Sequence, residues 1–237
     1  MKSQSALEFM SIIAVGLTLI AIASFFGIDY ITSYFSDINV INARQTVDNI
    51  VSSTNLVYAQ GVTATTKVYV NLPSNIVRNR TYVYGKEINL RFRDGELRDL
   101  YRNTKVNVYG SIPLNPGRVA LTVKMFSDGA FLFVDGQDIA IVYVRTFNDS
   151  NHDNPDDIFS DGDTVYYEID LADINLAAKN SAVNIAIYKP DGSLFDEQNV
   201  LVNREYKGEF TVTEKGHWVI SAMLPTKIIG TSVFEVI

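Results

Sequence analysis

The sequence contains no cysteine and only two histidines among its 237 residues. Disulfide bonds, cysteine nucleophiles and cysteine-ligated zinc are therefore excluded. His152 and His217 lie far apart and form no His-Glu-x-x-His or His-x-x-x-His motif, so the usual helical pair of zinc ligands is absent. The chain also lacks a phosphate-binding loop, a Gly-x-Gly-x-x-Gly fingerprint and a Gly-x-Ser-x-Gly motif. We therefore expect a protein that is not an enzyme.

Basic residues are in deficit, with 20 lysines and arginines against 27 aspartates and glutamates and a net charge of −7. A surface that binds nucleic acid needs a basic stripe to face the phosphates. We expect no nucleic-acid partner.

Charge is absent altogether from Phe9 to Ile28. As a helix this segment is about 30 Å long, which matches the hydrocarbon core of a bilayer. Glu8 stands directly before it. Placing a carboxylate in the middle of a bilayer is unfavourable by roughly 2.5–3.5 kcal/mol, and by less near the interface. An acid at the start of a membrane segment is therefore expected to have a functional role. No small-residue cleavage site follows the apolar run, so we expect the helix to stay on the mature protein.

Residues 2–9, Lys-Ser-Gln-Ser-Ala-Leu-Glu-Phe, together with the uncharged run behind them, resemble the class III signal peptide of archaeal type IV pilin-like proteins. The resemblance implies that a prepilin peptidase cuts between Ser3 and Gln4, that Lys2 is the cytoplasmic charge, and that residues 1–3 are the leader. Glu8 then becomes the fifth residue of the mature chain, where pilins typically carry a glutamate. It implies that Glu8 and Phe9 act in assembly, with the new amine of Gln4 facing the Glu8 of a neighbouring subunit.

The residues alone also allow a plain signal anchor, with Glu8 at the cytoplasmic interface. Both interpretations place Lys2 in the cytoplasm and the rest of the chain outside. They differ in whether the helix ever leaves the membrane.

The helical pattern continues beyond the apolar run with a single apolar stripe, and Gly61 stands where a helix would stop. We predict one long helix over residues 4–61, with the transmembrane or filament-core part at 9–28. Its second half would pack against the globular part of the chain. The stripe consists of Ile31, Tyr34, Phe35, Ile38, Ile41, Val47, Ile50 and Val57.

After Gly61 apolar residues alternate with polar ones, which is typical of half-buried antiparallel strands. Turn signals at Asp94-Gly95, Asp128-Gly129 and Asp135-Gly136 separate them. We predict an α+β protein, a long N-terminal hydrophobic helix followed by two antiparallel β-sandwich domains at 62–147 and 161–237. The first resembles the head domains of archaeal pilin-like proteins, and the second resembles an immunoglobulin-like sandwich.

Residues 148–160 are acidic and break the alternation, so we expect an interdomain linker there. Oxygen-bearing side chains at alternate positions of a loop can also converge on a calcium ion. The segment resembles the calcium loops of thrombospondin-type-3 and dockerin repeats, with Asn154 in place of the usual glycine. The candidate ligands of a structural Ca²⁺ are Asp149, Asn151, Asp153, Asp156 and Asp157.

Two Asn-x-Ser/Thr sequons, at Asn79 and Asn148, are possible glycosylation sites in an exported chain.

These observations favour a pilin-like structural subunit of an extracellular type IV pilus-like filament, with heads for adhesion or surface cohesion. Its expected partners are identical or related pilin subunits, the prepilin peptidase, the assembly ATPase and platform, and the membrane before assembly. Two alternatives stay open. One is a membrane-anchored sandwich protein of the archaellum stator type that binds the surface layer. The other is an anchored binding module with a calcium loop.

Overall fold

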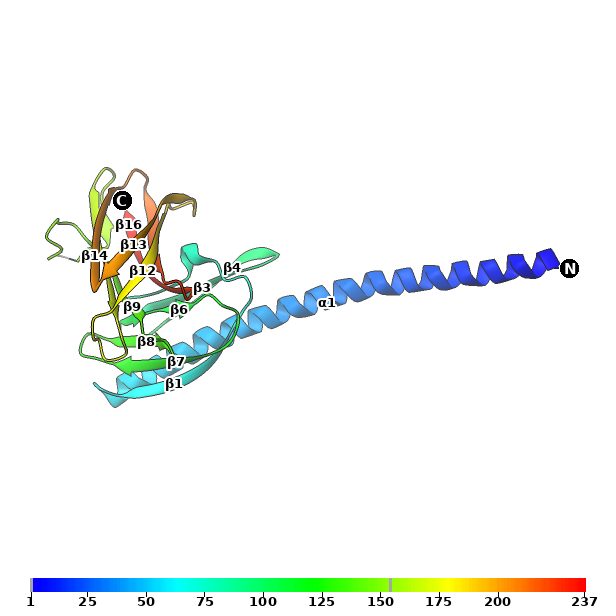
Figure 1. The fold of residues 1–237 in the computed structure, drawn as a ribbon, viewed down its shortest axis with the longest axis horizontal. Helices are drawn as coiled ribbons and strands as arrows, with labels where there is room; N and C mark the ends of the chain where they lie inside the picture. Colours follow the sequence, from blue (N-terminus) through cyan, green and yellow to red (C-terminus); the bar gives the residue numbers. More distant parts are fainter. Residues whose placement is uncertain (1, 154) are drawn as a thin grey trace. The chain divides into compact units, whose positions relative to one another are not determined.

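The computed structural model describes residues 2–153 and 155–237. Side chains are described for these residues except 2–8, 29, 31–33, 35 and 36. Over these residues the fold is α+β, as predicted: one long helix, one short 3₁₀ helix and mainly antiparallel sheets with β-sandwich character (Figure 1). The parallel pairs are β5 with β8 and β10 with β16. The chain divides into two compact units, Met1–Ile41 and Asn42–Ile237.

Helix α1 (Lys2–Gln60) belongs to both units. In the first unit its side chains from Phe9 to Ile28 are solvent-exposed or half-buried. In the second unit one stripe of the helix is buried, at the three- and four-residue spacing that an amphipathic helix requires. The helix ends where Gly61, with a φ of 91°, donates its N–H to the carbonyl of Val57. The buried stripe consists of Ala43, Thr46, Val47, Ile50, Thr54 and Val57.

The predicted stripe is therefore confirmed only at Val47, Ile50 and Val57. Tyr34 and Ile41 are exposed, and Ile38 is half-buried. The side chains of Ile31 and Phe35 lie outside the described residues.

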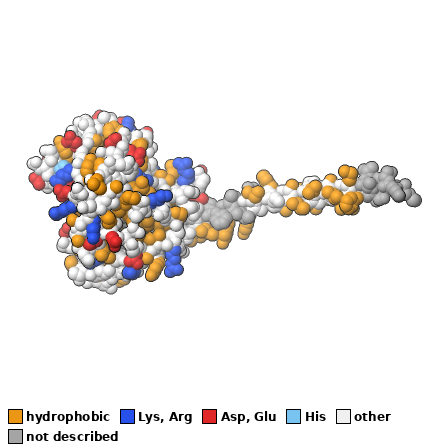
Figure 2. All heavy atoms as spheres, viewed as in Figure 1, with side chains coloured by type: hydrophobic (Ala, Val, Ile, Leu, Met, Phe, Trp, Pro, Cys, Tyr) orange, Lys and Arg blue, Asp and Glu red, His pale blue; other side chains and the backbone are white. Residues whose placement is uncertain are grey.

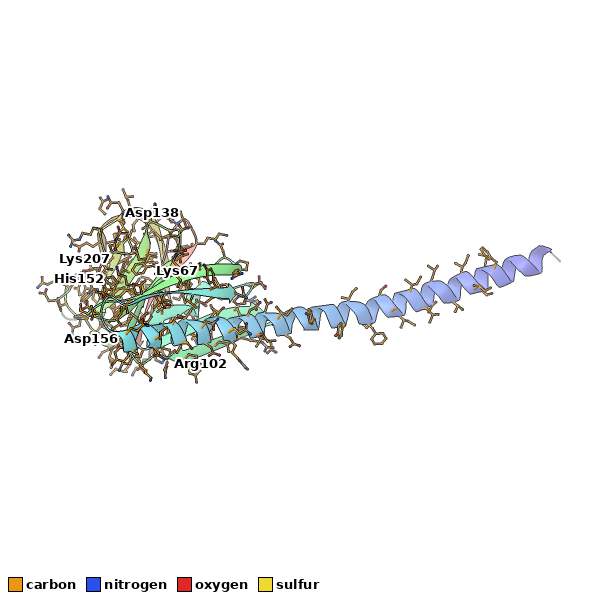
Figure 3. All side chains as sticks on the ribbon, turned by 90° about the horizontal axis from the view of Figure 1, so that it is seen from below. Lys67, Arg102, Asp138, His152, Asp156 and Lys207 are labelled. Atoms are coloured by element: carbon orange, nitrogen blue, oxygen red, sulfur yellow. The ribbon has the colours of Figure 1, made fainter. Side chains whose placement is uncertain are left out.

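A four-stranded sheet lies beside residues 42–60 of α1, and Figures 1 and 3 show the two running together. Thr46 Oγ1 donates to the carbonyl of Asn71 on the edge strand, 2.8 Å away. Strand order is β1-β7-β8-β5, with bounds β1 (Thr65–Leu72), β5 (Val108–Gly110), β7 (Gly117–Met125) and β8 (Ala130–Val134).

A three-stranded antiparallel sheet follows the short helix η1 (Arg78–Arg80). One face of its central strand is apolar and fully buried, through Ile88, Leu90 and Phe92. The Asp94-Gly95 turn joins the central strand to the edge strand, as the sequence predicts. The strands are β2 (Tyr82–Tyr84), β3 (Glu87–Asp94) and β4 (Glu96–Asn103).

The large sheet has nine strands in the order β10-β16-β15-β12-β13-β14-β11-β9, with β6 pairing to β16. It curls on itself, since Ile141 of β9 approaches Gly230 of β16 so closely that a Cβ on Gly230 would lie 2.4 Å from Ile141 Cγ2. The strands are β6 (Ile112–Pro113), β9 (Ala140–Phe147), β10 (Ile158–Phe159), β11 (Thr164–Ala172), β12 (Asn180–Tyr188), β13 (Leu194–Asn203), β14 (Glu205–Thr211), β15 (Gly216–Met223) and β16 (Ile228–Val236).

The observed division of the chain differs from the predicted one. Strands β6 and β9 lie inside the predicted first sandwich, 62–147, yet they pair with β16 and β11 of the predicted second sandwich, 161–237. Residues 148–163 connect β9 and β11, which are neighbours in one sheet, and Ile158 and Phe159 of the predicted linker form β10 within this connection. The acidic composition marks an exposed connection within a sheet rather than a boundary between domains.

The aromatic core of the large sheet centres on Trp218, which is fully buried. Its ring lies 5.8 Å from that of Phe210 and 5.3 Å from that of Phe195. The indole Nε1 donates to the carbonyl of Glu214 at 2.8 Å, which satisfies the one polar group that Trp218 brings into the core.

Candidate functional site

The apolar segment Phe9–Ile28 is the first candidate site. It is 20 residues long with a mean hydropathy of 2.4, and none of it is buried. Figure 2 shows hydrophobic side chains over this part of α1 with no charged side chain among them. Such a surface is unfavourable in water, so it requires lipid or another apolar partner. By length and composition it could serve as a signal sequence or a membrane anchor.

The predicted processing and assembly residues lie mostly outside the described side chains. Lys2, Ser3, Gln4 and Glu8 fall within α1, but their side chains are not described. Phe9 is described and is 65% exposed, so it is open to contact with a partner.

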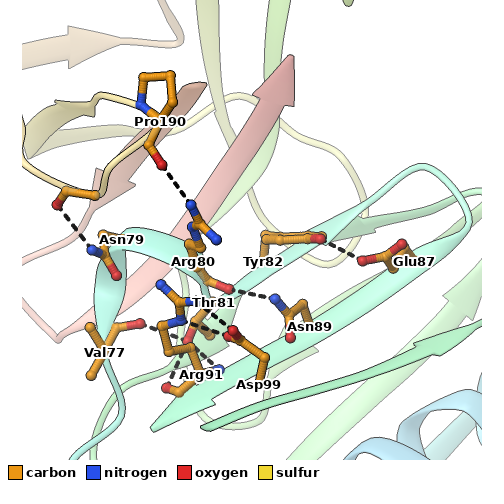
Figure 4. A network of polar contacts seen from close by, with 11 residues as sticks. Val77, Asn79, Arg80, Thr81, Tyr82, Glu87, Asn89, Arg91, Asp99 and Pro190 are labelled. Carbon is orange, nitrogen blue, oxygen red and sulfur yellow. Dashed lines mark hydrogen bonds and ion pairs between the residues drawn. The ribbon is translucent and has the colours of Figure 1, made fainter. Parts of the chain in front are cut away.

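A groove of about 760 Å³ lies between the three-stranded sheet and strands β10, β15 and β16. Its floor is the polar face of the sheet, opposite the buried apolar face. Strand register places Tyr82 opposite Asn89, and Asn89 opposite Tyr101, so these three residues form one row across β2, β3 and β4. Figure 4 shows Tyr82 and Asn89 in the polar network beside this floor.

Asn89 is the centre of that row and is only 7% exposed. Its Nδ2 donates to the carbonyl of Arg80 at 3.0 Å, whereas its Oδ1 has no hydrogen-bond partner among the described residues. An unsatisfied buried acceptor costs about 1–3 kcal/mol, so a donor that reaches Asn89 Oδ1 at the floor of the groove would remove this cost.

The carboxylates near the floor are held in place by neighbours. The hydroxyl of Tyr82 donates to Glu87, and burial, followed by the hydrogen bond to Glu87, raises the pKa of Tyr82 above its ordinary value. Arg91 Nε donates to Asp99 Oδ1 at 2.6 Å (Figure 4). The floor is therefore polar and preorganised, with an aromatic ring at each end of the row.

A second candidate is the acidic cluster Glu168, Asp170 and Glu205, on neighbouring strands β11 and β14. Ligand oxygens of the three carboxylates lie within 4.8 Å of one another, the one such group of three or more among the described residues. The cluster lines a pocket of about 250 Å³ and could bind a metal ion.

A cation already lies beside these carboxylates. Arg145 Nη2 is 2.7 Å from Glu168 Oε1 and 2.9 Å from Asp170 Oδ2. Burial, and next the charge of Glu168, raise the pKa of Asp170 from 3.8 to about 6, against the opposing effect of Arg145. The cluster thus carries more negative charge than Arg145 offsets.

The carboxylates of the predicted calcium loop largely bind the loop's own backbone. Asp149 Oδ1 accepts the N–H groups of Asn151 and Asp153, and Asp156 Oδ1 accepts those of Asp157 and Ile158. These acids do not form a group of three converging ligands among the described residues, and Asn154 lies outside them. The calcium loop stays a prediction.

The histidine of this loop packs on aromatic rings. The ring of His152 lies 4.9 Å from that of Phe147 and 5.9 Å from that of Tyr166. Figure 3 shows His152 and Asp156 at the same end of the molecule's globular part. The contacts fix the loop over the β9–β11 pair.

The two sequons differ in their surroundings. Asn148 is exposed, with Nδ2 3.2 Å from Asp156 Oδ2. Asn79 is half-buried, and its Nδ2 donates to the carbonyl of Gly192 at 3.1 Å (Figure 4). A glycan on Asn79 would replace one of the two Nδ2 hydrogens and would be crowded by the turn at Gly192.

The sequence patterns described above do not predict the groove residues or the acidic cluster. The groove row follows from the hairpin register around Asp94-Gly95, since a tight turn there brings Tyr101 opposite Asn89. That signal was present in the sequence. The cluster, by contrast, depends on the pairing of β11 with β14, which are separated by two strands along the chain.

Comparison with models of known protein families finds no match, and comparison with curated protein sequences finds none either. Among solved structures the chain is similar to the CARDB domain of a Pyrococcus furiosus protein, determined in complex with di-metal ions. The identity is 15%, the match covers 42% of this chain and 88% of that chain, and the TM-score is 0.29.

Two further solved structures are larger. An E. coli alpha-2-macroglobulin matches with 11% identity over 73% of this chain and 15% of its own, at a TM-score of 0.34. A Listeria innocua beta-glucosidase matches with 13% identity over 40% of this chain and 16% of its own, at a TM-score of 0.24. At such TM-scores neither metal nor substrate carries over. The chain is a β-strand-rich protein, weakly similar to CARDB domains, with an N-terminal apolar helix.

Proposed function

We propose that the chain is a pilin-like structural subunit of an extracellular type IV pilus-like filament, and that it is not an enzyme. One observation carries the proposal: α1 is a single helix whose first part is apolar and exposed on all sides and whose last part is buried along one stripe. A helix of this kind has one half for packing with other helices and one half for its own globular unit.

During assembly the apolar segment of α1 would exchange its contacts with lipid for contacts with the helices of other subunits. Before assembly, Phe9–Ile28 spans the membrane, with the globular unit outside the cell. In the filament the same segments pack against each other in a central bundle. Ala14, Gly16, Ala21, Ala23 and Gly27 present little side-chain bulk, and a Cβ atom on Gly16 or Gly27 would contact nothing. In a membrane the hydrophobic effect does not drive helices together, so association depends on close packing. Small residues allow the helix backbones to approach closely enough for such packing.

The energy and the processing come from partners. In this proposal a prepilin peptidase cuts between Ser3 and Gln4, and an assembly ATPase with its platform extracts the subunit. The new amine of Gln4 would then be neutralised by Glu8 of a neighbouring subunit. Pairing of this kind offsets the cost of burying two charges only in good geometry, so it would also fix the axial register of the subunits.

Mass spectrometry of the mature N terminus, on material sheared from the cell surface, tests the proposal. A chain that begins at Gln4 and sediments with filaments supports it. A chain that begins at Met1 and stays with the membrane contradicts it, and favours a permanently anchored surface protein of the stator type.

A further inference from the structure

The groove above the three-stranded sheet has the chemistry of a carbohydrate site. Two tyrosines, Tyr82 and Tyr101, flank Asn89 in a row across three strands. Their positions are two strand spacings apart, about 10 Å, which is the length of two linked pyranose units. Aromatic faces cover the C–H faces of sugar rings, while amides and carboxylates bind the hydroxyl groups between them.

The polar groups of the groove are mostly acceptors. Asn89 Oδ1 is buried and has no hydrogen-bond partner among the described residues. Glu87 and Asp99 lie beside it on the floor, and Asp157 and Glu235 lie on the opposite side. A ligand with many hydroxyl donors satisfies acceptors of this kind.

Charge narrows the class of ligand. Four carboxylates, Glu87, Asp99, Asp157 and Glu235, line the groove together with two permanent cations, Arg80 and Lys86. Arg80 is directed elsewhere, since its Nη2 donates to the carbonyl of Pro190 at 2.7 Å. With Arg91, which is paired with Asp99, four carboxylates face three cations. The remaining negative charge disfavours uronic acids, sulfated sugars and nucleic acid.

We propose that this groove binds a neutral oligosaccharide, with Tyr82 and Tyr101 against the first and third of three linked sugar rings and Asn89 Oδ1 accepting a hydroxyl hydrogen bond from the ring between them. Its volume lies within the usual range of ligand sites in proteins. The use of the groove for adhesion by a filament rests on the proposed function, whereas sugar binding itself does not.

Tyr101 is the residue to change, because it is 62% exposed and its loss leaves the buried face of the sheet intact. Tyr69 of β1 is a matched control, since it is 57% exposed and lies outside the groove. Tyr101→Phe keeps the ring and removes only the hydroxyl, so it separates stacking from hydrogen bonding.

The experiment uses the full chain in lipid nanodiscs, because detergents with sugar headgroups would compete for the groove. The probes are maltotetraose, cellotetraose, mannotetraose and tetra-N-acetylchitotetraose, with tetragalacturonate as the anionic comparison. Binding is followed by titration calorimetry and by saturation-transfer NMR. We expect at least one neutral tetrasaccharide to bind, Tyr101→Ala to weaken it about tenfold or more, and Tyr101→Phe and Tyr69→Ala to bind as the wild type does.

Three results would overturn the proposal: no neutral probe binds the wild type, Tyr101→Ala and Tyr69→Ala bind alike, or tetragalacturonate binds more tightly than every neutral probe. Because the chain is dispersed in this assay, these results are independent of filament assembly. If the groove binds no sugar, the proposal of filament assembly is unaffected. If the chain forms no filament, the proposal of sugar binding is likewise unaffected.

Discussion

The guanidinium of Arg78 donates to both the side-chain and the backbone oxygen of Asn184, which joins helix η1 to strand β12 of the large sheet. The same guanidinium donates to Oγ and the carbonyl of Ser221 on β15. Burial lowers the pKa of Arg78, but an arginine stays charged at any ordinary pH. This contact links η1, which leads into the three-stranded sheet, to the large sheet within the unit Asn42–Ile237.

Loss of that contact should destabilise the globular unit. Arg78→Ala leaves the oxygens of Asn184 and Ser221 without their donor, and we expect the free energy of unfolding to fall by about 2–3 kcal/mol. Trp218 is the single tryptophan and is fully buried, so its fluorescence reports unfolding in urea. Arg98→Ala, an exposed arginine on β4, is the control and should change little. Equal effects of the two substitutions would contradict the importance of the Arg78 contact.

Glu8 is expected to act in assembly rather than in insertion. Glu8→Ala should abolish or strongly reduce filaments while the chain still inserts in the membrane, because Phe9–Ile28 alone is long and apolar enough to span it. Filament yield after shearing and carbonate extraction of membranes measure the two outcomes. Asp37→Ala, an exposed acid farther along α1, is the control. Normal filament yield from Glu8→Ala would argue against the role.

The raised pKa of Asp170 predicts a specific pH dependence. The folded protein holds this proton up to about pH 6, whereas the unfolded chain releases it near 3.8. The stabilising effect of protonation is therefore fully present below about 3.8 and is lost as the pH rises through 6. Asp170→Asn, which cannot ionise, should gain stability relative to wild type between pH 4 and pH 8.

Thermal unfolding of the two proteins at both pH values measures this gain. Asp138→Asn, an exposed acid away from the cluster, should show no such trend. A constant difference between wild type and Asp170→Asn at the two pH values would rule out the predicted linkage.

Calcium binding by residues 149–157 can be separated from metal binding by the acidic cluster. If the loop holds Ca²⁺ with the weak affinity common in extracellular modules, millimolar Ca²⁺ should stabilise the protein by roughly 1–3 kcal/mol, and EDTA should reverse the effect. Asp153→Asn should abolish the gain and Glu205→Gln should preserve it. If Glu205→Gln abolishes the gain and Asp153→Asn preserves it, the ion binds at Glu168, Asp170 and Glu205 instead. If Ca²⁺ does not stabilise the wild type, the predicted calcium loop is refuted.

We expect the two Asn-x-Ser/Thr sequons to differ in glycan occupancy. We expect Asn148, which is exposed, to accept a glycan, and Asn79 to stay unmodified because it is half-buried against the turn at Gly192. Mass spectrometry of glycopeptides from native material gives the occupancy of each. A glycan on Asn79 in folded protein would contradict the hydrogen bond seen there.

Patterns local in the sequence predicted much of this fold. The extent of α1, its end before Gly61 and the turn at Asp94-Gly95 each depend on a few neighbouring residues. Strand β4 (Glu96–Asn103) is not predicted by polar–apolar alternation, because both of its faces are largely exposed. The groove needs that strand, since Tyr101 lies on it.

Features that depend on pairing between distant strands could not be predicted. The acidic composition of residues 148–160 predicts a domain boundary, yet β9 and β11 on its two sides are neighbours in one sheet. The cluster of Glu168 and Glu205 likewise exists only because β14 returns beside β11. A run of charged residues in the sequence indicates which segment is exposed to solvent. The order of the strands in the sheet determines which charged side chains lie next to each other.

Electron cryo-microscopy of filaments sheared from cells that produce the chain tests the central claim most directly. The account predicts a helical polymer in which the segments Phe9–Ile28 form the core, with each subunit beginning at Gln4. Recovery of the chain only from membranes, with its first three residues intact and in no filament, would contradict it.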